Sequence, residues 1–150
     1  MLETAVLALH VLAATCWFGP KLFWARRLRG ILAATPEDAK SLVPALGREL
    51  SFTSVSALAA IATGVAMIFI HGGFKAVPPR IHSGLGLTLA AFFAMLALEV
   101  PAIARIRAAC DRGAPKESEA QVKRVVMGVM IEHTCWLVTL VLMVWRVPPS

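Results

Sequence analysis

Charged side chains are scarce in this sequence: they make up 16% of its 150 residues, whereas hydrophobic residues make up 58%. A soluble domain of this size needs a polar surface, and this sequence has too few charged residues to form one around so many apolar side chains. The charges that are present gather between long apolar runs. The composition therefore excludes an ordinary soluble domain and predicts an integral membrane protein.

Cysteine is also rare, and Cys16, Cys110 and Cys135 include no CxxC spacing. The sequence therefore gives no disulfide framework and no cysteine-based zinc site, and we expect small buried thiols. The amino terminus lacks the positive segment that precedes the apolar core of a signal peptide. We expect the first apolar run, which contains His10, to be retained.

Acidic residues number nine against fifteen Lys and Arg, which gives a formal net charge of +6. This balance invites a nucleic-acid interpretation, but the basic residues lie beside the apolar runs, where membrane topology places them. We therefore expect the chain to contact a lipid bilayer and no nucleic acid.

Four apolar runs are each close to the ~20 residues that a helix needs to cross a hydrocarbon core. Backbone groups in lipid have no water to bond, so runs of this length must be helices. The sequence predicts an all-α, integral membrane four-helix bundle that forms a single transmembrane domain over residues 1–150. The runs cover residues 5–24, 52–70, 81–104 and 125–145.

Lys and Arg gather in two of the three connections between these runs. The 25–50 connection carries five of them and the 105–124 connection six, whereas the 71–80 connection has only Lys75 and Arg80. The positive-inside rule places the two basic connections in the cytoplasm. Both termini and the 71–80 connection then face the periplasm, and we expect the inner membrane of a bacterium.

Two of the helices are expected to extend on the cytoplasmic side. Thr35 and Pro36 fit an N-cap followed by proline at the first helical position, so the second helix begins near Pro36. Ser118 followed by Gln121 fits a capping box, so the fourth helix begins near Glu119.

The 71–79 stretch has two glycines near its start and two prolines at its end, which break the helix on both sides and make helices 2 and 3 an antiparallel hairpin. On helix 3, Gly86, Ala90 and Ala94 place a small residue at every fourth position, which lets another helix approach closely. That neighbour is either a helix of the same bundle or a partner. We expect a homo-oligomer or a larger membrane complex.

Ionisable residues inside the apolar runs are functional candidates, because a charge at the bilayer centre costs roughly 2.5–3.5 kcal/mol. Glu99 and Glu132 are expected to pair with Lys21 or with other basic side chains that reach in from the interface, or to stay protonated. The sharper alternative is a proton path that also uses His133. For His10, the simpler interpretation is a hydrogen bond to a neighbouring helix.

Three histidines, His10, His71 and His82, fall in the outer half of the membrane. Imidazole is a common metal ligand that suits iron, copper and zinc. Helix bundles build cofactor sites from side chains on facing helices, so His10 and His82 are the predicted axial ligands of haem b, with His71 as a substitute. The simpler interpretation of His71 and His82 is that they lie at the interface beside a loop.

Other residues near these histidines are candidate cofactor contacts. Trp17 shares the helix face of His10, and Gly86 shares that of His82, where a glycine leaves room for a flat ligand. Arg80 lies at the same membrane face and could hold the haem propionates.

The stretch Leu9-His10, Trp17-Phe18-Gly19 and Pro20-Lys21-Leu22-Phe23 resembles the first helix of the HemJ-type protoporphyrinogen oxidases and of the related CopD-type copper-handling membrane proteins. The resemblance implies a four-helix membrane fold with haem at His10 and His82. In the HemJ-type family a lysine follows the helix-3 histidine two residues later, but here Ser83 and Gly84 follow His82. The resemblance therefore implies haem binding more directly than oxidase activity.

Three functions follow from these features. The first is a b-type haem protein that acts in electron transfer or haem-dependent oxidation, which would make it an iron-dependent oxidoreductase. The second is copper handling by His10, His71 and His82, with thioether or thiolate help from Met67, Met143 or, at mid-depth, Cys135. The third is a non-catalytic accessory subunit that packs against a larger complex.

Overall fold

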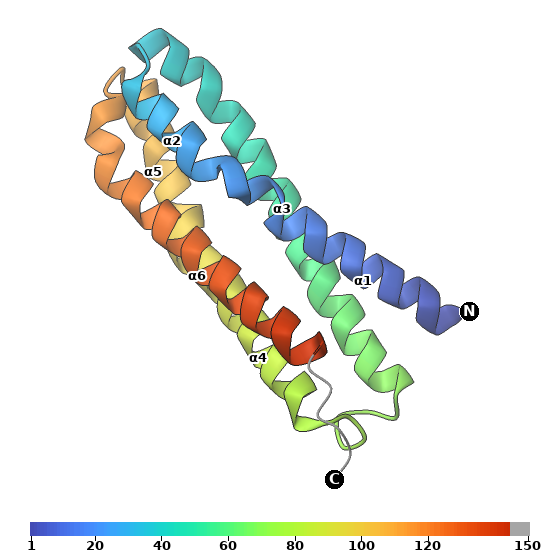
Figure 1. The fold of residues 1–150 in the computed structure, drawn as a ribbon. Coiled ribbons are helices and arrows are strands. Elements are labelled where there is room, and N and C mark those ends of the chain that lie inside the picture. Colours follow the sequence, from blue (N-terminus) through green and yellow to red (C-terminus); the bar gives the residue numbers. More distant parts are fainter. Residues whose placement is uncertain (145–150) are drawn as a thin grey trace.

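The computed structural model describes residues 1–144 and contains only helices over that part of the chain (Figure 1). Four helical runs are long and apolar enough to cross a membrane. These findings confirm the predicted all-α class and the four candidate spans. The runs cover Leu2–Ala33, Pro36–Ile70, Pro79–Asp111 and Pro115–Val144. Residue 145, where the fourth predicted run ends, lies outside the described residues.

Two of the four runs are interrupted by a short irregular segment, and the fourth begins with one; the sequence analysis did not foresee these segments. The first run changes from α-helix to a 3-10 turn and back, and the third contains one π-helical turn. In chain order the elements are α1 (Leu2–Phe18), η1 (Pro20–Phe23), α2 (Trp24–Ala33), α3 (Pro36–Ile70), α4 (Pro79–Ala94), η2 (Met95–Glu99), α5 (Val100–Asp111), η3 (Pro115–Ser118) and α6 (Glu119–Val144).

Both ends of α3 lie where the sequence predicts them. The Thr35 hydroxyl accepts a hydrogen bond from the backbone N–H of Asp38 at 3.3 Å, and Pro36 is the first helical residue. After the helix, Gly72 and Gly73 have φ values of 94° and 88°, which other residues adopt only with strain. The N-cap and the break before α4 are therefore confirmed.

The fourth long helix begins at the predicted residue but not with the predicted cap. The Ser118 hydroxyl donates to the carbonyl of Pro115 at 2.6 Å. Oε1 of Gln121 is buried and has no hydrogen-bond partner among the residues described. The capping box is therefore wrong, because the turn η3 occupies the serine.

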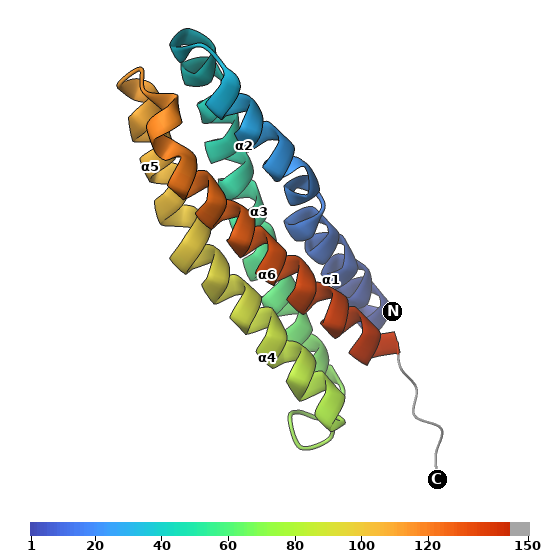
Figure 2. The same ribbon diagram turned by 60° about the vertical axis from the view of Figure 1, so that its left-hand side comes forward.

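The helices pack as two pairs, with α1 along α3 and α4 along α6 (Figures 1 and 2). We call the end with the 34–35 and 112–114 connections the basic end, and the opposite end the amino-terminal end. One buried apolar cluster, which includes Trp24, Leu28 and Ile106, joins α2, α3, α5 and α6 near the basic end. A second, which includes Trp17 and Met95, lies further along the bundle.

The small-residue stripe on α4 faces outward. Gly86 and Ala90 are exposed and Ala94 is half-buried. The close approach within the bundle uses Gly84, where a Cβ atom would lie 3.1 Å from Cε of Met143 on α6. Packing inside the bundle therefore does not account for the stripe.

Candidate functional site

The most buried polar cluster consists of Lys21, Glu99 and Glu132. Nζ of Lys21 lies 2.7 Å from Oε2 of Glu99 and 2.7 Å from Oε2 of Glu132, and 3.0 Å from Oε1 of Glu132. The exposed fraction is 1% for Lys21 and 0% for both glutamates. The pairing of both acids with Lys21 is confirmed, and we call this cluster the ionic triad.

A break in the first helical run brings Lys21 into the interior. The backbone N–H of Gly19 donates to the carbonyl of Thr15 at 2.9 Å, and a Cβ atom at Gly19 would lie only 2.8 Å from that oxygen. The chain then enters η1, whose tighter turn places Lys21 inward. Its Nζ also lies 5.3 Å from the centroid of the Trp24 ring, within range of a cation–π contact.

A second irregular segment positions Glu99. This residue ends the π-helical turn η2, and Pro101 follows two residues later. A proline cannot donate a helical hydrogen bond, and single π turns occur frequently at functional sites. Across the interface, Gly128 of α6 leaves room for the carboxylate, since a Cβ atom there would lie 2.9 Å from Cγ of Glu99.

Several buried polar atoms around the triad lack hydrogen bonds within residues 1–144. They are Nε1 of Trp17, Oε1 of Glu99 and Nε2 of His133. His133 donates through Nδ1 to the carbonyl of Val129 at 2.8 Å, which leaves only its second nitrogen free. Unsatisfied buried polar groups are costly, so these atoms remain available for further hydrogen bonds in this part of the interior.

A separate cavity of about 340 Å³ opens at the amino-terminal end, between the α1/α3 pair and the α4/α6 pair. Its lining is mostly apolar. Its size lies within the usual range for small-molecule sites, about 300–1,000 Å³. The lining residues with metal-binding or charged side chains are His10, Met67, His71, Arg80 and Met143.

His10 is half-buried in this cavity and is held from one side. Its Nδ1 lies 2.9 Å from the carbonyl oxygen of Ala60 and 3.1 Å from Oγ1 of Thr63. The carbonyl can only accept, so Nδ1 carries the proton and Nε2 remains a free acceptor. Gly64 allows this approach, because a Cβ atom there would lie 3.2 Å from Cε1 of His10.

The other predicted ligands are exposed. His71 lines the cavity, and its Nδ1 donates to the carbonyl of Met67 at 2.8 Å, while its Nε2 lies 3.3 Å from Oε1 of Glu3. His82 does not line the cavity; its ring lies 6.1 Å from that of Phe74.

Two further candidates lie away from the cavity. Gly86 is on the exposed face of α4, and a Cβ atom there would meet nothing within 4 Å. Trp17 is fully buried beside the triad, with its ring 4.4 Å from that of Phe18. The structure thus brings together His10, His71 and Arg80 but not the other predicted cofactor contacts.

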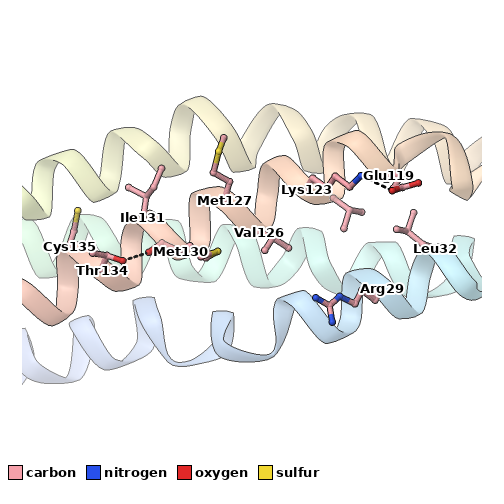
Figure 3. A pocket seen from close by; sticks show the side chains of 11 residues that line it. Arg29, Leu32, Glu119, Lys123, Val126, Met127, Met130, Ile131, Thr134 and Cys135 are labelled. Carbon is pink, nitrogen blue, oxygen red and sulfur yellow. Dashed lines mark hydrogen bonds and ion pairs between the residues drawn. The ribbon is translucent and has the colours of Figure 1, made fainter.

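A larger groove of about 730 Å³ runs along α6 and α2 toward the basic end (Figure 3). Arg29, Glu119 and Lys123 lie at its end, and Lys123 pairs with Glu119 at 2.8 Å. The remaining walls are largely apolar side chains, several of them exposed, such as Met127 and Met130. No buried ionisable groups converge on this groove, so it is a weaker candidate for chemistry.

Sequence reasoning did not foresee that two glycines make room for these sites, although Gly64 belongs to the layout that resembles the HemJ-type and CopD-type proteins. Gly128 lies four residues before Glu132 on α6, and Gly64 lies four residues after Ala60 on α3. Spacing alone indicates that each shares a helix face with a site residue. Which side chain fills the space depends on the packing of another helix.

Within residues 1–144 no group of three or more His, Cys, Asp or Glu side chains is arranged to hold a metal ion. Comparison with known protein families, with curated proteins and with solved structures gives no match for this chain.

Proposed function

We propose that the chain is a four-pass membrane protein that binds haem b in the amino-terminal cavity, with His10 as an axial ligand. Its role is electron transfer or a haem-dependent oxidation. The observation that carries the proposal is the fixed orientation of His10, whose Nδ1 donates to the carbonyl of Ala60. Histidines that bind metals usually donate their other ring nitrogen in this way, which sets the tautomer and orients the ring.

The cavity residues fit such a group in part. Its apolar walls suit a porphyrin, and the guanidinium of Arg80 at the cavity can bind a carboxylate such as a haem propionate. When bound, haem supplies one-electron chemistry. The chain's own contribution is to orient His10, to exclude water with apolar side chains, and to neutralise the propionates.

The second axial ligand is better assigned to His71 than to His82. His71 lines the same cavity as His10, whereas His82 is exposed beside Phe74. The Nε2 of His71 lies 3.3 Å from Oε1 of Glu3, and this contact would be given up if His71 held the group. His82 is therefore the matched control histidine in the tests below.

Copper binding is the second candidate, and the methionines favour it. Met67 and Met143 line the cavity together with His10 and His71. Thioether sulfur is a soft ligand that selects copper(I), and imidazole also suits copper. Two imidazoles and two thioethers are donors of the types that copper(I) takes.

We place the cavity at the periplasmic side of a bacterial inner membrane. The support is the excess of Lys and Arg in the connections at the basic end, which the positive-inside rule assigns to the cytoplasm. The resemblance of the first helix to HemJ-type and CopD-type proteins agrees with both candidate functions. The outward stripe of Gly86, Ala90 and Ala94 is the surface we assign to a second copy or to a partner subunit.

Absorption spectra of the detergent-purified protein, oxidised and then reduced with dithionite, test the haem proposal. We expect a Soret band that shifts on reduction, is lost in His10→Ala and is retained in His82→Ala. A colourless protein that haem does not reconstitute would overturn the haem assignment. Metal analysis of the same preparation, with copper lost in both Met67→Leu and His10→Ala, would establish the copper alternative.

A further inference from the structure

The ionic triad lies outside the cavity and is not used by the proposed haem or copper chemistry. Its three side chains come from three different segments, η1, η2 and α6. Each of the first two departs from regular α-helix where it supplies its charged residue. Irregular helical segments of this kind often mark functional sites, and here two of them place members of one cluster.

The charges of the triad do not balance if all three groups are ionised. Lys21 contributes one positive charge, and Glu99 and Glu132 contribute two negative charges, which leaves one net negative charge in a fully buried cluster. An uncompensated buried charge is expensive because the surroundings have a low dielectric constant. One bound proton on either carboxylate makes the cluster neutral.

We propose that the triad is a proton-binding site within the membrane-spanning part of the bundle, holding one exchangeable proton between Glu99 and Glu132. Both carboxylates accept from the same Nζ at 2.7 Å, so the charge of each acts on the other and the two bind protons as a coupled pair. On binding, the proton forms an O–H bond to one carboxylate oxygen, and Lys21 stays charged and paired with the other carboxylate. No electron or co-reactant is required.

The unsatisfied atoms beside the triad support this assignment. Oε1 of Glu99 is fully buried without a hydrogen bond and is therefore free to carry or to accept the proton. The indole N–H of Trp17 is also buried and has no hydrogen-bond partner among residues 1–144, so it remains available as a donor. His133 follows Glu132 on α6, and its Nε2, which has no hydrogen-bond partner among residues 1–144, can accept a proton.

The other groups around the triad leave this charge count unchanged. Trp24 covers Lys21 from α2, and Cys135 of α6 packs against the apolar cluster that contains Trp17. Glu49 of α3 is engaged with Arg27 and with Nε1 of Trp24 instead of with Lys21.

Infrared spectroscopy of the detergent-purified protein in H2O and D2O tests the site. It needs no cofactor, so its outcome is separate from that of the haem proposal. We expect a C=O stretching band of a protonated carboxylic acid that persists at neutral pH and shifts in D2O. Glu99→Gln and Glu132→Gln should each abolish this band, because each leaves a neutral Lys–Glu pair.

The matched control is Glu119→Gln, which alters an exposed carboxylate paired with Lys123 and should leave the band unchanged. Absence of the band in the wild type would overturn the proposal, as would its survival in the double variant Glu99→Gln/Glu132→Gln. A band that does not shift in D2O would show that the proton does not exchange with solvent, which would also contradict the proposal. Loss of the wild-type band on addition of sodium or potassium would reassign the site to a monovalent cation.

Discussion

Lys21 and Glu99 are separated by 78 positions in the sequence, and their side chains meet at 2.7 Å with no exposure to solvent. This contact links the first helical run to the third at the two segments where the backbone is irregular. The packing of those runs depends on this contact, because either charge without its partner would be uncompensated in an apolar interior.

Replacing the lysine of the triad should therefore be severe. Lys21→Met leaves two buried carboxylates without a cation, and removing one partner of a buried ion pair costs about 3–5 kcal/mol. We expect a lower unfolding temperature in detergent, or loss of the folded protein. The control is Lys75→Met on an exposed loop, which should change the unfolding temperature little.

Gly128→Ala should displace Glu99. The new Cβ atom would lie 2.9 Å from Cγ and 3.1 Å from Oε1 of that residue, so the side chain must move. Overpacking of this kind costs about 1–3 kcal/mol. Thermal unfolding measures the effect, and Gly86→Ala, where nothing lies within 4 Å, is the control. Equal stability of the two variants would contradict the described packing.

Gly64→Ala should disturb the cavity through His10. The added Cβ atom would lie 3.2 Å from Cε1 of the imidazole, and a ring shifted by a few tenths of an ångström binds a metal less well. We expect a weaker affinity for haem or copper, measured by titration of the purified protein. Gly47→Ala, with nothing within 4 Å of the new atom, should keep the wild-type affinity.

The N-cap of α3 should contribute to stability outside the apolar spans. Thr35→Ala removes the hydroxyl that accepts from the backbone N–H of Asp38, a loss of about 1 kcal/mol. Thermal or chemical unfolding checks this value. Ser51→Ala, whose hydroxyl only returns to the carbonyl of Gly47 in its own helix, should lower stability less.

The direction of the chain in the membrane can be measured by labelling. Single-cysteine variants Lys75→Cys and Lys116→Cys, made after Cys16, Cys110 and Cys135 are replaced by serine or alanine, should react with an impermeant maleimide from opposite sides of intact cells. We expect only the residue 75 variant to react from outside. Labelling of the residue 116 variant from outside would invert the proposed topology.

The helices were predictable because length and apolar composition alone identify segments that can span a membrane. The start of α3 was predictable because Thr35 and Pro36 are local signals that need no partner. The capping box at Ser118 failed because a local alternative, the carbonyl of Pro115, competes for the same hydroxyl. Local sequence patterns thus predicted where the helices end more reliably than they predicted the hydrogen bonds that cap those ends.

The candidate site was predictable only in part, for a geometric reason. The apolar setting of Glu99, Glu132 and Lys21 made their pairing a reasonable expectation, since a charge in lipid must find a partner. The joint use of His10 and His82 depended on the rotation of two helices about their own axes. Sequence does not set that rotation, and the structure turns His82 toward Phe74.

The two buried apolar clusters have a consequence for how the molecule moves. They fasten the helices near the basic end and further along the bundle, whereas the amino-terminal end encloses a cavity in place of a third cluster. Segments with few packed neighbours open at the lowest free-energy cost. The amino-terminal end of α1 and the nearby end of α4 can therefore separate to admit ligands of different widths, while the helices at the basic end keep their packing.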